Sequence, residues 1–211
     1  MKDLHYKSAT WMAQAIRQGE LSSRELVQAS IERIRQVNPR LNAVVQLTAG
    51  QAMDDAQKAD EEWKQGSLRG PLHGVPMTIK DSIDTAGVVT TWGTVGRKGH
   101  IPGRDATIVS RLKRAGAILL GKTNTPEMTL SFATANRVYG RTNNPHDLSR
   151  TPGGSSGGCA LRPAVIAWAA PAPVAAESLR AARKVPAAAP AESRAAAGAE
   201  SRPAGAAPPA P

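Results

Sequence analysis

One stretch of the sequence consists almost entirely of small and hydroxyl-bearing residues. It reads Thr-Pro-Gly-Gly-Ser-Ser-Gly-Gly over residues 151–158, so that four glycines surround Ser155 and Ser156. Glycine adopts positive φ without strain and lets other groups approach the backbone closely. The stretch is therefore either a flexible linker or a tight loop that presents a serine hydroxyl to a buried site. Its composition alone favours the linker.

A lysine that could act as a base follows a short apolar run. Residues 75–79 are Val-Pro-Met-Thr-Ile, which indicates a buried strand, and Lys80 comes directly after them. A lysine at a strand end usually reaches solvent. If burial desolvates the amine, however, its pKa falls and it can serve as a general base near neutral pH. Since lysine can replace histidine as the base for a serine nucleophile, Lys80 and Ser155, 75 residues apart, form a candidate catalytic pair.

The elements that would position this pair alternate between helical and apolar patterns. Ser22 and Glu25 have the spacing of a capping box, and the helix that they open is expected to stop before Asn38 and Pro39. Further helices are predicted over residues 8–18, 49–65 and 106–115, and strands over 41–47, 75–79 and 117–120. This order predicts an α/β protein with a mixed β-sheet flanked by helices.

The composition changes abruptly at Cys159. Residues 159–211 contain 22 alanines and 9 prolines in 53 residues, with no sustained apolar period. Prolines recur every few residues and would interrupt any helix that the alanines favour. Such a segment cannot offset its ordering entropy by burial, so we expect it to be disordered or out-of-frame sequence. The predicted organisation is a structured part over 1–158 and a low-complexity tail over 159–211.

Charge and composition restrict the classes of function. The formal net charge is +10, but aromatic residues make up only 3% of the chain and do not interleave with the basic ones, which argues against a nucleic-acid partner. The single cysteine excludes a disulfide framework. No histidines have metal-ligand spacing, so no metal and no cofactor are expected; the four are His5, His73, His100 and His146.

Targeting signals are also missing from the pattern. The first residues lack the apolar region of a secretory signal, and no apolar run approaches the length of a membrane span. We therefore expect a cytoplasmic protein with no membrane partner.

Four motifs occur in order along the chain and carry a family resemblance. They are Gly-Pro-Leu-His-Gly-Val-Pro-Met-Thr-Ile-Lys-Asp over 70–81, Gly-Lys-Thr-Asn-Thr-Pro-Glu over 121–127, Tyr-Gly-Arg-Thr-Asn-Asn-Pro over 139–145, and the stretch that leads from Ser149 into the glycine–serine loop. Together they closely resemble the amidase signature family. The resemblance covers residues 1–158 and is densest from residue 70 onward.

The resemblance implies an α/β/α fold and a Ser–cis-Ser–Lys triad that hydrolyses small-molecule amides without a cofactor. Lys80 matches the family's lysine base. Ser155 matches the bridging serine, whose preceding peptide bond is typically cis in the family. Ser156 and the glycines around the pair would support the loop; these glycines are Gly153, Gly154 and Gly157.

The third member of the triad does not match the family. There, the nucleophilic serine follows in a Gly-Gly-Ser motif about two dozen residues after the bridging serine. The serine nearest that position here is Ser178, 23 residues after Ser155, and it follows Glu177 instead of glycine. A carboxylate would oppose a developing oxyanion. Ser178 is thus only a positional candidate, and we expect a truncated amidase with little or no activity.

Two alternatives remain open on the sequence. The same motifs occur in the amidase-type subunit of glutamyl-tRNA amidotransferase, which works with other subunits. A chain of net charge +10 could also be a non-catalytic basic binding protein, although its charge is spread along the chain. The sequence does not determine the oligomeric state or the particular amide.

Overall fold

The computed structural model describes residues 4–160. The helices are α1 (Ala9–Gln18), α2 (Ser23–Leu41), α3 (Ala49–Lys64), α4 (Thr107–Arg114) and α5 (Gly157–Ala160). The strands are β1 (Val44–Leu47), β2 (Pro76–Lys80), β3 (Ile118–Thr123), β4 (Ala135–Asn136) and β5 (Gly140–Arg141). Short 3-10 helices lie at Leu4–Tyr6, Val95–Arg97 and Glu127–Thr129.

The main sheet has three strands in the order β1-β3-β2, and the predicted mixed α/β architecture is confirmed. β3 pairs with β1 antiparallel and with β2 parallel. The other pair, β4 and β5, forms a small antiparallel ribbon. Because β2 and β3 are parallel, the chain crosses between them through a long loop and α4, and both strands end at the same edge of the sheet.

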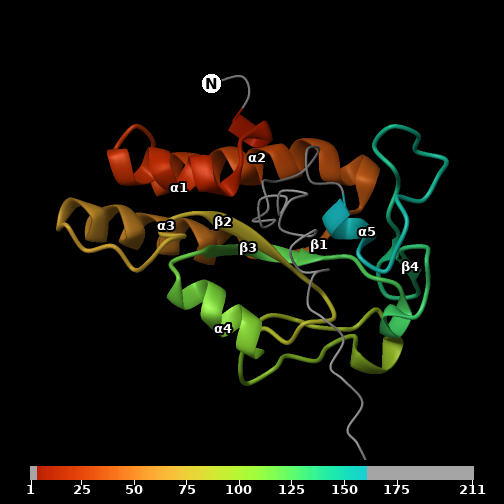
Figure 1. Cartoon of the computed structure of the whole chain (residues 1–211). Coiled ribbons are helices and arrows are strands. Elements are labelled where there is room, and N and C mark those ends of the chain that lie inside the picture. The colour runs from red at the N-terminus through yellow and green to blue at the C-terminus, as the bar shows by residue number, and fades with distance from the viewer. Residues whose placement is uncertain (1–3, 161–211) are drawn as a thin grey trace, which may run out of the picture. The chain divides into compact units, whose positions relative to one another are not determined.

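Helices cover both faces of the main sheet (Figure 1). Ile118 and Leu120 of β3 point toward α2 and α3, where a stripe of buried alanines on α3 allows close packing. Leu119 points the opposite way and packs with Met77 and Val109 on the α4 side. Successive side chains of a strand point to opposite faces, so this alternation divides the core between two layers.

Local signals at the start of the chain set the ends of the first helices. Ser8 caps α1 by accepting a hydrogen bond from the Trp11 amide (3.1 Å), and Gly19 ends the helix with φ of 74°. Ser22 and Glu25 form the expected capping box at the start of α2. In each case the partners are three or four residues apart, so the sequence pattern contains the whole interaction.

The end of α2 was predicted wrongly. The helix continues through Asn38 and Pro39 to Leu41, and β1 is therefore shorter than the expected strand over 41–47. Proline removes one helical donor, but the Asn38 side chain offsets this loss by accepting hydrogen bonds from the amides of Ala43 and Val44, each at 2.8 Å. The helix ends instead at Asn42, whose φ is 52°.

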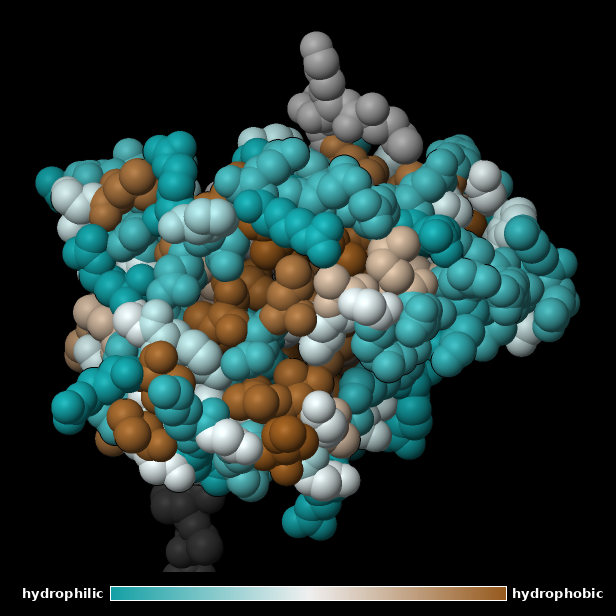
Figure 2. Space-filling view, turned by 180° about the vertical axis from the view of Figure 1, so that it is seen from behind, coloured by the Kyte–Doolittle hydropathy of each residue, from teal (hydrophilic) through white to brown (hydrophobic). Residues whose placement is uncertain are grey.

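Hydrophobic side chains gather in the middle of the face that Figure 2 shows, bordered by hydrophilic surface. The most exposed large apolar residues of the described part are Phe132, at 92% exposure, and Leu130, at 86%.

None of the helices in residues 4–160 has the length and hydrophobicity that crossing a bilayer requires. The predicted tail over 159–211 lies outside the described residues, apart from its first two positions.

Candidate active site

Lys80 lies at the carboxyl end of β2 and contacts the glycine–serine loop. Its Nζ donates hydrogen bonds to Ser155 Oγ (2.9 Å) and Ser156 Oγ (3.1 Å). In the sheet, Lys80 is paired with Thr123 of β3. The structure thus brings together three of the residues that the sequence singled out, over a separation of 75 residues, and the loop over 151–158 is not a free linker.

The surroundings of Lys80 shift its amine toward the neutral form. Burial lowers the pKa of Lys80 below its ordinary value of 10.5, and a negative charge on Cys159 would raise it again. Burial, however, raises the pKa of the Cys159 thiol, whose Sγ lies 2.8 Å from Thr123 Oγ1. The thiol is therefore neutral near pH 7 and does not reverse the shift, so the fraction of Lys80 able to accept a proton increases.

Thr134 and Thr125 hold the loop that carries Ser155. Thr134 Oγ1 donates to the carbonyl of Gly153 (2.7 Å) and accepts from the amide of Gly157 (3.0 Å), so it bridges the two sides of the serine pair. Thr125 Oγ1 donates to the carbonyl of Ser155 (3.2 Å). The peptide bond between Gly154 and Ser155 is cis. The hydrogen bonds of Thr134 and Thr125 fix the direction in which Ser155 faces Lys80.

Three glycines of the loop are required by space, among them Gly154, where a Cβ would lie 2.8 Å from the carbonyl oxygen of Ser131. A Cβ on Gly157 would collide with the Thr134 side chain, and a Cβ on Gly158 would lie 2.5 Å from the amide nitrogen of Asn124. Gly153 has φ of 92°, a conformation that favours glycine. The glycines therefore permit close packing against the segment after β3.

Asn124 connects the segments around the loop. Its Nδ2 donates to Thr142 Oγ1 (2.9 Å), and its Oδ1 accepts from Asn136 Nδ2 (2.7 Å). Asn124 is fully buried, so these bonds satisfy polar groups that water does not reach. The motif that contains Lys122 thus meets the motif that contains Tyr139 at one buried side-chain amide, and Gly158 of the glycine–serine loop packs against the backbone of the same asparagine.

Sequence reasoning missed the supporting threonines and the buried Lys122. Thr125 and Thr134 look like ordinary polar residues, and only the fold places them under the serine pair. Ser178 lies outside the described residues, so its position relative to Lys80 stays a prediction. Within residues 4–160, no group of His, Cys, Asp or Glu side chains is arranged to hold a metal ion.

Comparison with known proteins defines the class. The family model described as Amidase matches residues 25–172. The chain therefore belongs to the amidase family. The match extends past residue 158, and the predicted domain boundary there stays a prediction.

Individual relatives carry several names. A glutamyl-tRNA(Gln) amidotransferase subunit from Acidothermus cellulolyticus is 42% identical over 171 residues, which is 81% of this chain and 34% of the relative. An acylamidase from Rhodococcus erythropolis is 43% identical over 155 residues, 74% of this chain and 32% of the relative. The solved peptide amidase from Stenotrophomonas maltophilia superposes with a TM-score of 0.68 at 38% identity, over 72% of this chain and 32% of that chain. The chain thus spans about a third of the length of these relatives.

Proposed function

We propose that this chain supplies the lysine base and the bridging serine of an amidase that hydrolyses small carboxylic amides. The observation that carries the proposal is the 2.9 Å hydrogen bond between Lys80 Nζ and Ser155 Oγ. A serine held by a partly desolvated lysine is suited to proton transfer, and the lowered pKa of Lys80 is in the direction that a general base needs.

The reaction follows from these positions. Neutral Lys80 takes the hydroxyl proton of Ser155 while Ser155 takes the proton of the nucleophilic serine. The nucleophile attacks the amide carbonyl, the carbon–nitrogen bond breaks, and the relay returns a proton to the leaving amine. Water then attacks the acyl ester and gives a proton to the relay, the bond between the acyl carbon and the serine oxygen breaks, and the relay returns the proton to that oxygen as the carboxylic acid leaves. Ser156, which also accepts a hydrogen bond from Lys80, would keep the amine oriented between proton transfers.

The chain has no nucleophilic serine in a sequence context suited to catalysis. Ser178 is the positional candidate, but Glu177 precedes it where an oxyanion site needs hydrogen-bond donors. The proposal is accordingly that the chain by itself has little or no turnover, although its family role is amide hydrolysis.

A turnover assay tests both parts of the proposal. The chain itself is assayed on simple aliphatic and aryl amides, beside Lys80→Ala. A chimera that joins residues 1–158 to the corresponding remainder of the Rhodococcus acylamidase is assayed in parallel. We expect no Lys80-dependent turnover in the chain, and turnover in the chimera that Lys80→Ala lowers roughly 10²–10⁴-fold.

The exposed Lys58 on α3 provides the matched control, since Lys58→Ala should leave the chimera's turnover unchanged. Turnover by the chain that depends on Lys80 would contradict the proposed inactivity. A folded chimera whose turnover survives Lys80→Ala would contradict the proposed relay.

A second candidate function is that of the amidotransferase subunit. It is favoured by the 42% identity to such a protein over 171 residues, a longer match than the 155 residues shared with the acylamidase. Affinity purification from the native cell distinguishes the two: copurified partner chains and tRNA-dependent amide formation support the amidotransferase, whereas a lone chain supports the simple amidase. Fractionation of the same cells tests the proposed cytoplasmic location.

A further inference from the structure

A second lysine lies buried on the other face of the sheet from Lys80. In the pairing of β2 with β3, Lys122 is opposite Ile79 and Thr123 is opposite Lys80. Because neighbouring strand residues point to opposite faces, Lys122 lies on the face of Ile79, on the α4 side, whereas Lys80 faces the glycine–serine loop. Lys122 is 0% exposed, and its amine forms its hydrogen bonds away from the serine pair.

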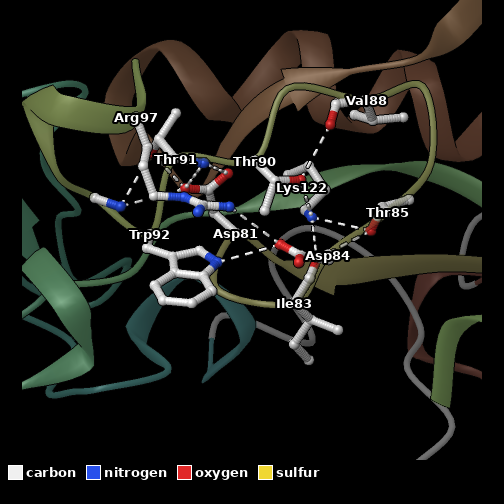
Figure 3. A network of polar contacts seen from close by, with 11 residues as sticks. Asp81, Ile83, Asp84, Thr85, Val88, Thr90, Thr91, Trp92, Arg97 and Lys122 are labelled. Carbon is white, nitrogen blue, oxygen red and sulfur yellow. Dashed lines mark hydrogen bonds and ion pairs between the residues drawn. The ribbon is translucent and has the colours of Figure 1, made fainter. Parts of the chain in front are cut away.

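Three oxygen atoms surround the Lys122 amine, and all belong to the loop that follows Lys80 (Figure 3). Nζ donates to the carbonyl of Ile83 and, at 3.0 Å each, to Thr85 Oγ1 and Thr90 Oγ1. The hydroxyl protons of the two threonines are already used, since Thr85 donates to the carbonyl of Ile83 and Thr90 to that of Val88. The threonines therefore accept, and a charged ammonium with its three protons fits the three acceptors.

The charge on this amine is consistent with its surroundings. Burial lowers the pKa of Lys122 to about 8, while Asp81 is the acidic side chain that most opposes the shift. The amine is therefore protonated at pH 7 and can donate all three bonds. A buried ammonium with complete hydrogen bonding resists displacement, because any movement leaves a desolvated charge unsatisfied.

Asp81 holds the same loop from its other end. Its buried carboxylate accepts from Thr91 Oγ1 (2.6 Å), from the Thr91 amide (3.1 Å) and from the Gly93 amide (3.4 Å). The amide of Ile83 in turn donates to the carbonyl of Lys80 (3.0 Å), which closes a turn directly after the candidate base. Lys122 therefore binds the carbonyl of the same residue whose amide holds Lys80.

The position of β2 makes this contact important. β2 is an outer strand of the three-stranded sheet, so its far edge has no strand partner in the described part of the chain. The end of β2 is consequently held by β3 on one side and by the loop over 81–93 after it. A change in that loop reaches the Lys80 backbone through one hydrogen bond.

We propose that Lys122 is a positioning residue: by binding Ile83, Thr85 and Thr90, it fixes the turn after β2 and so keeps Lys80 Nζ at hydrogen-bond distance from Ser155. The proposal rests on the function proposed for Lys80. It assigns the lysine of the 121–127 motif a role on the opposite side of the sheet from the chemistry.

The test follows the Lys80 amine directly, in the full chain labelled with ¹³C and ¹⁵N lysine. Lys122→Met and the double variant Thr85→Val/Thr90→Val are compared with the wild type by NMR titration and by amide hydrogen exchange. We expect both variants to raise the pKa of Lys80 toward its ordinary value, because burial is what lowers it and an amine that moves away from Ser155 becomes more exposed to water. Exchange of the amides over 83–93 should become at least about tenfold faster as those amides lose protection.

Thr48→Val is the matched control, because Thr48 Oγ1 also donates one partly buried bond, to the carbonyl of Leu119 (3.0 Å), away from this turn. It should lower stability without moving the Lys80 titration. If Lys122→Met does not fold, the threonine variant decides. An unchanged Lys80 titration in a folded variant with faster loop exchange would overturn the positioning role and leave a structural one.

The readout needs no turnover, which separates this proposal from the proposed function. A Lys80 response to Lys122 supports the positioning role even if the chimera hydrolyses no amide, and that second result would count against the relay alone.

Discussion

Gly158 lies where the glycine–serine loop touches the segment after β3. A Cβ at this position would meet the Asn124 amide nitrogen at 2.5 Å and the carbonyl oxygens of Ala43 and Asn124 at 2.8 Å. Because all three neighbours are backbone atoms, Gly158→Ala should cost about 2–3 kcal/mol of unfolding free energy, the range of a strained insertion into a packed interior. Urea denaturation followed by circular dichroism measures the loss.

Gly50→Ala is the control, because it makes the same substitution at a position with free space. Nothing lies within 4 Å of a Cβ on Gly50, which is in α3, so the substitution should leave stability unchanged or raise it by up to about 1 kcal/mol. Equal losses in the two variants would show that the close contact at Gly158 does not determine its identity.

The candidate catalytic residues could be predicted where a residue type suited to the chemistry stood in a recognisable sequence motif. Lys80 after an apolar run and Ser155 between glycines were recognisable from the sequence, and the structure brings them within 2.9 Å. Lys122 stands in a recognised motif, yet its partners lie 32 to 39 residues earlier in a loop without periodicity. No local pattern could show that this lysine is buried and faces away from the site.

At the scale of elements, the two ends of α2 differ in the same way: one depends on neighbouring residues and the other on distant ones. Its start depends on Ser22 and Glu25, which are neighbours in sequence, and was predicted correctly. Its end depends on Asn42, whose Nδ2 donates to the carbonyls of Tyr139 (2.7 Å) and Arg141 (3.1 Å), about a hundred residues away. Long-range bonds of this kind override the local signal of a proline, and they hold α2 against the β4–β5 ribbon.

Two substitutions at Asn42 separate its backbone role from its side-chain role. Asn42→Gly keeps the positive φ but loses both bonds, and should cost about 1–2 kcal/mol. Asn42→Ala also adds the strain of a left-handed alanine, about 1 kcal/mol more. Urea denaturation of both variants checks this order, and an alanine variant as stable as the glycine variant would contradict the importance of the conformation.

At the scale of the whole molecule, buried Lys122 makes stability depend on pH. Its pKa is about 8 in the folded chain and ordinarily 10.5, so between these values the unfolded chain binds more protons than the folded one. Stability therefore rises with pH through this window, by about 3 kcal/mol from this group. Lys122→Met should remove this rise, as measured by urea denaturation at steps between pH 7.5 and 10.5.

Other groups titrate between the same pH values. The comparison of the wild type with the Lys122→Met variant accounts for them. The lowered pKa of Lys80 acts in the same direction as Lys122, whereas the raised pKa values of Tyr139 and Cys159 act in the opposite one. These three groups are present in both the wild type and the variant, so their contributions cancel in the difference between the two pH dependences. If the slopes of the wild type and the Lys122→Met variant coincide, Lys122 does not titrate in this window.

The last question at this scale is how the amidase sequence continues. The chain spans about a third of its relatives' length, and residues 159–211 combine 22 alanines with 9 prolines, unlike the part before them. We propose that a change of reading frame after the glycine–serine loop produces this segment. Sequencing the gene and the DNA downstream should then reveal a Gly-Gly-Ser motif in a shifted frame, about two dozen codons after Ser155, followed by further amidase sequence. A single intact frame, with no amidase continuation in either shifted frame, would contradict the proposal and make Ser178 the nucleophile to test, by Ser178→Ala in the turnover assay.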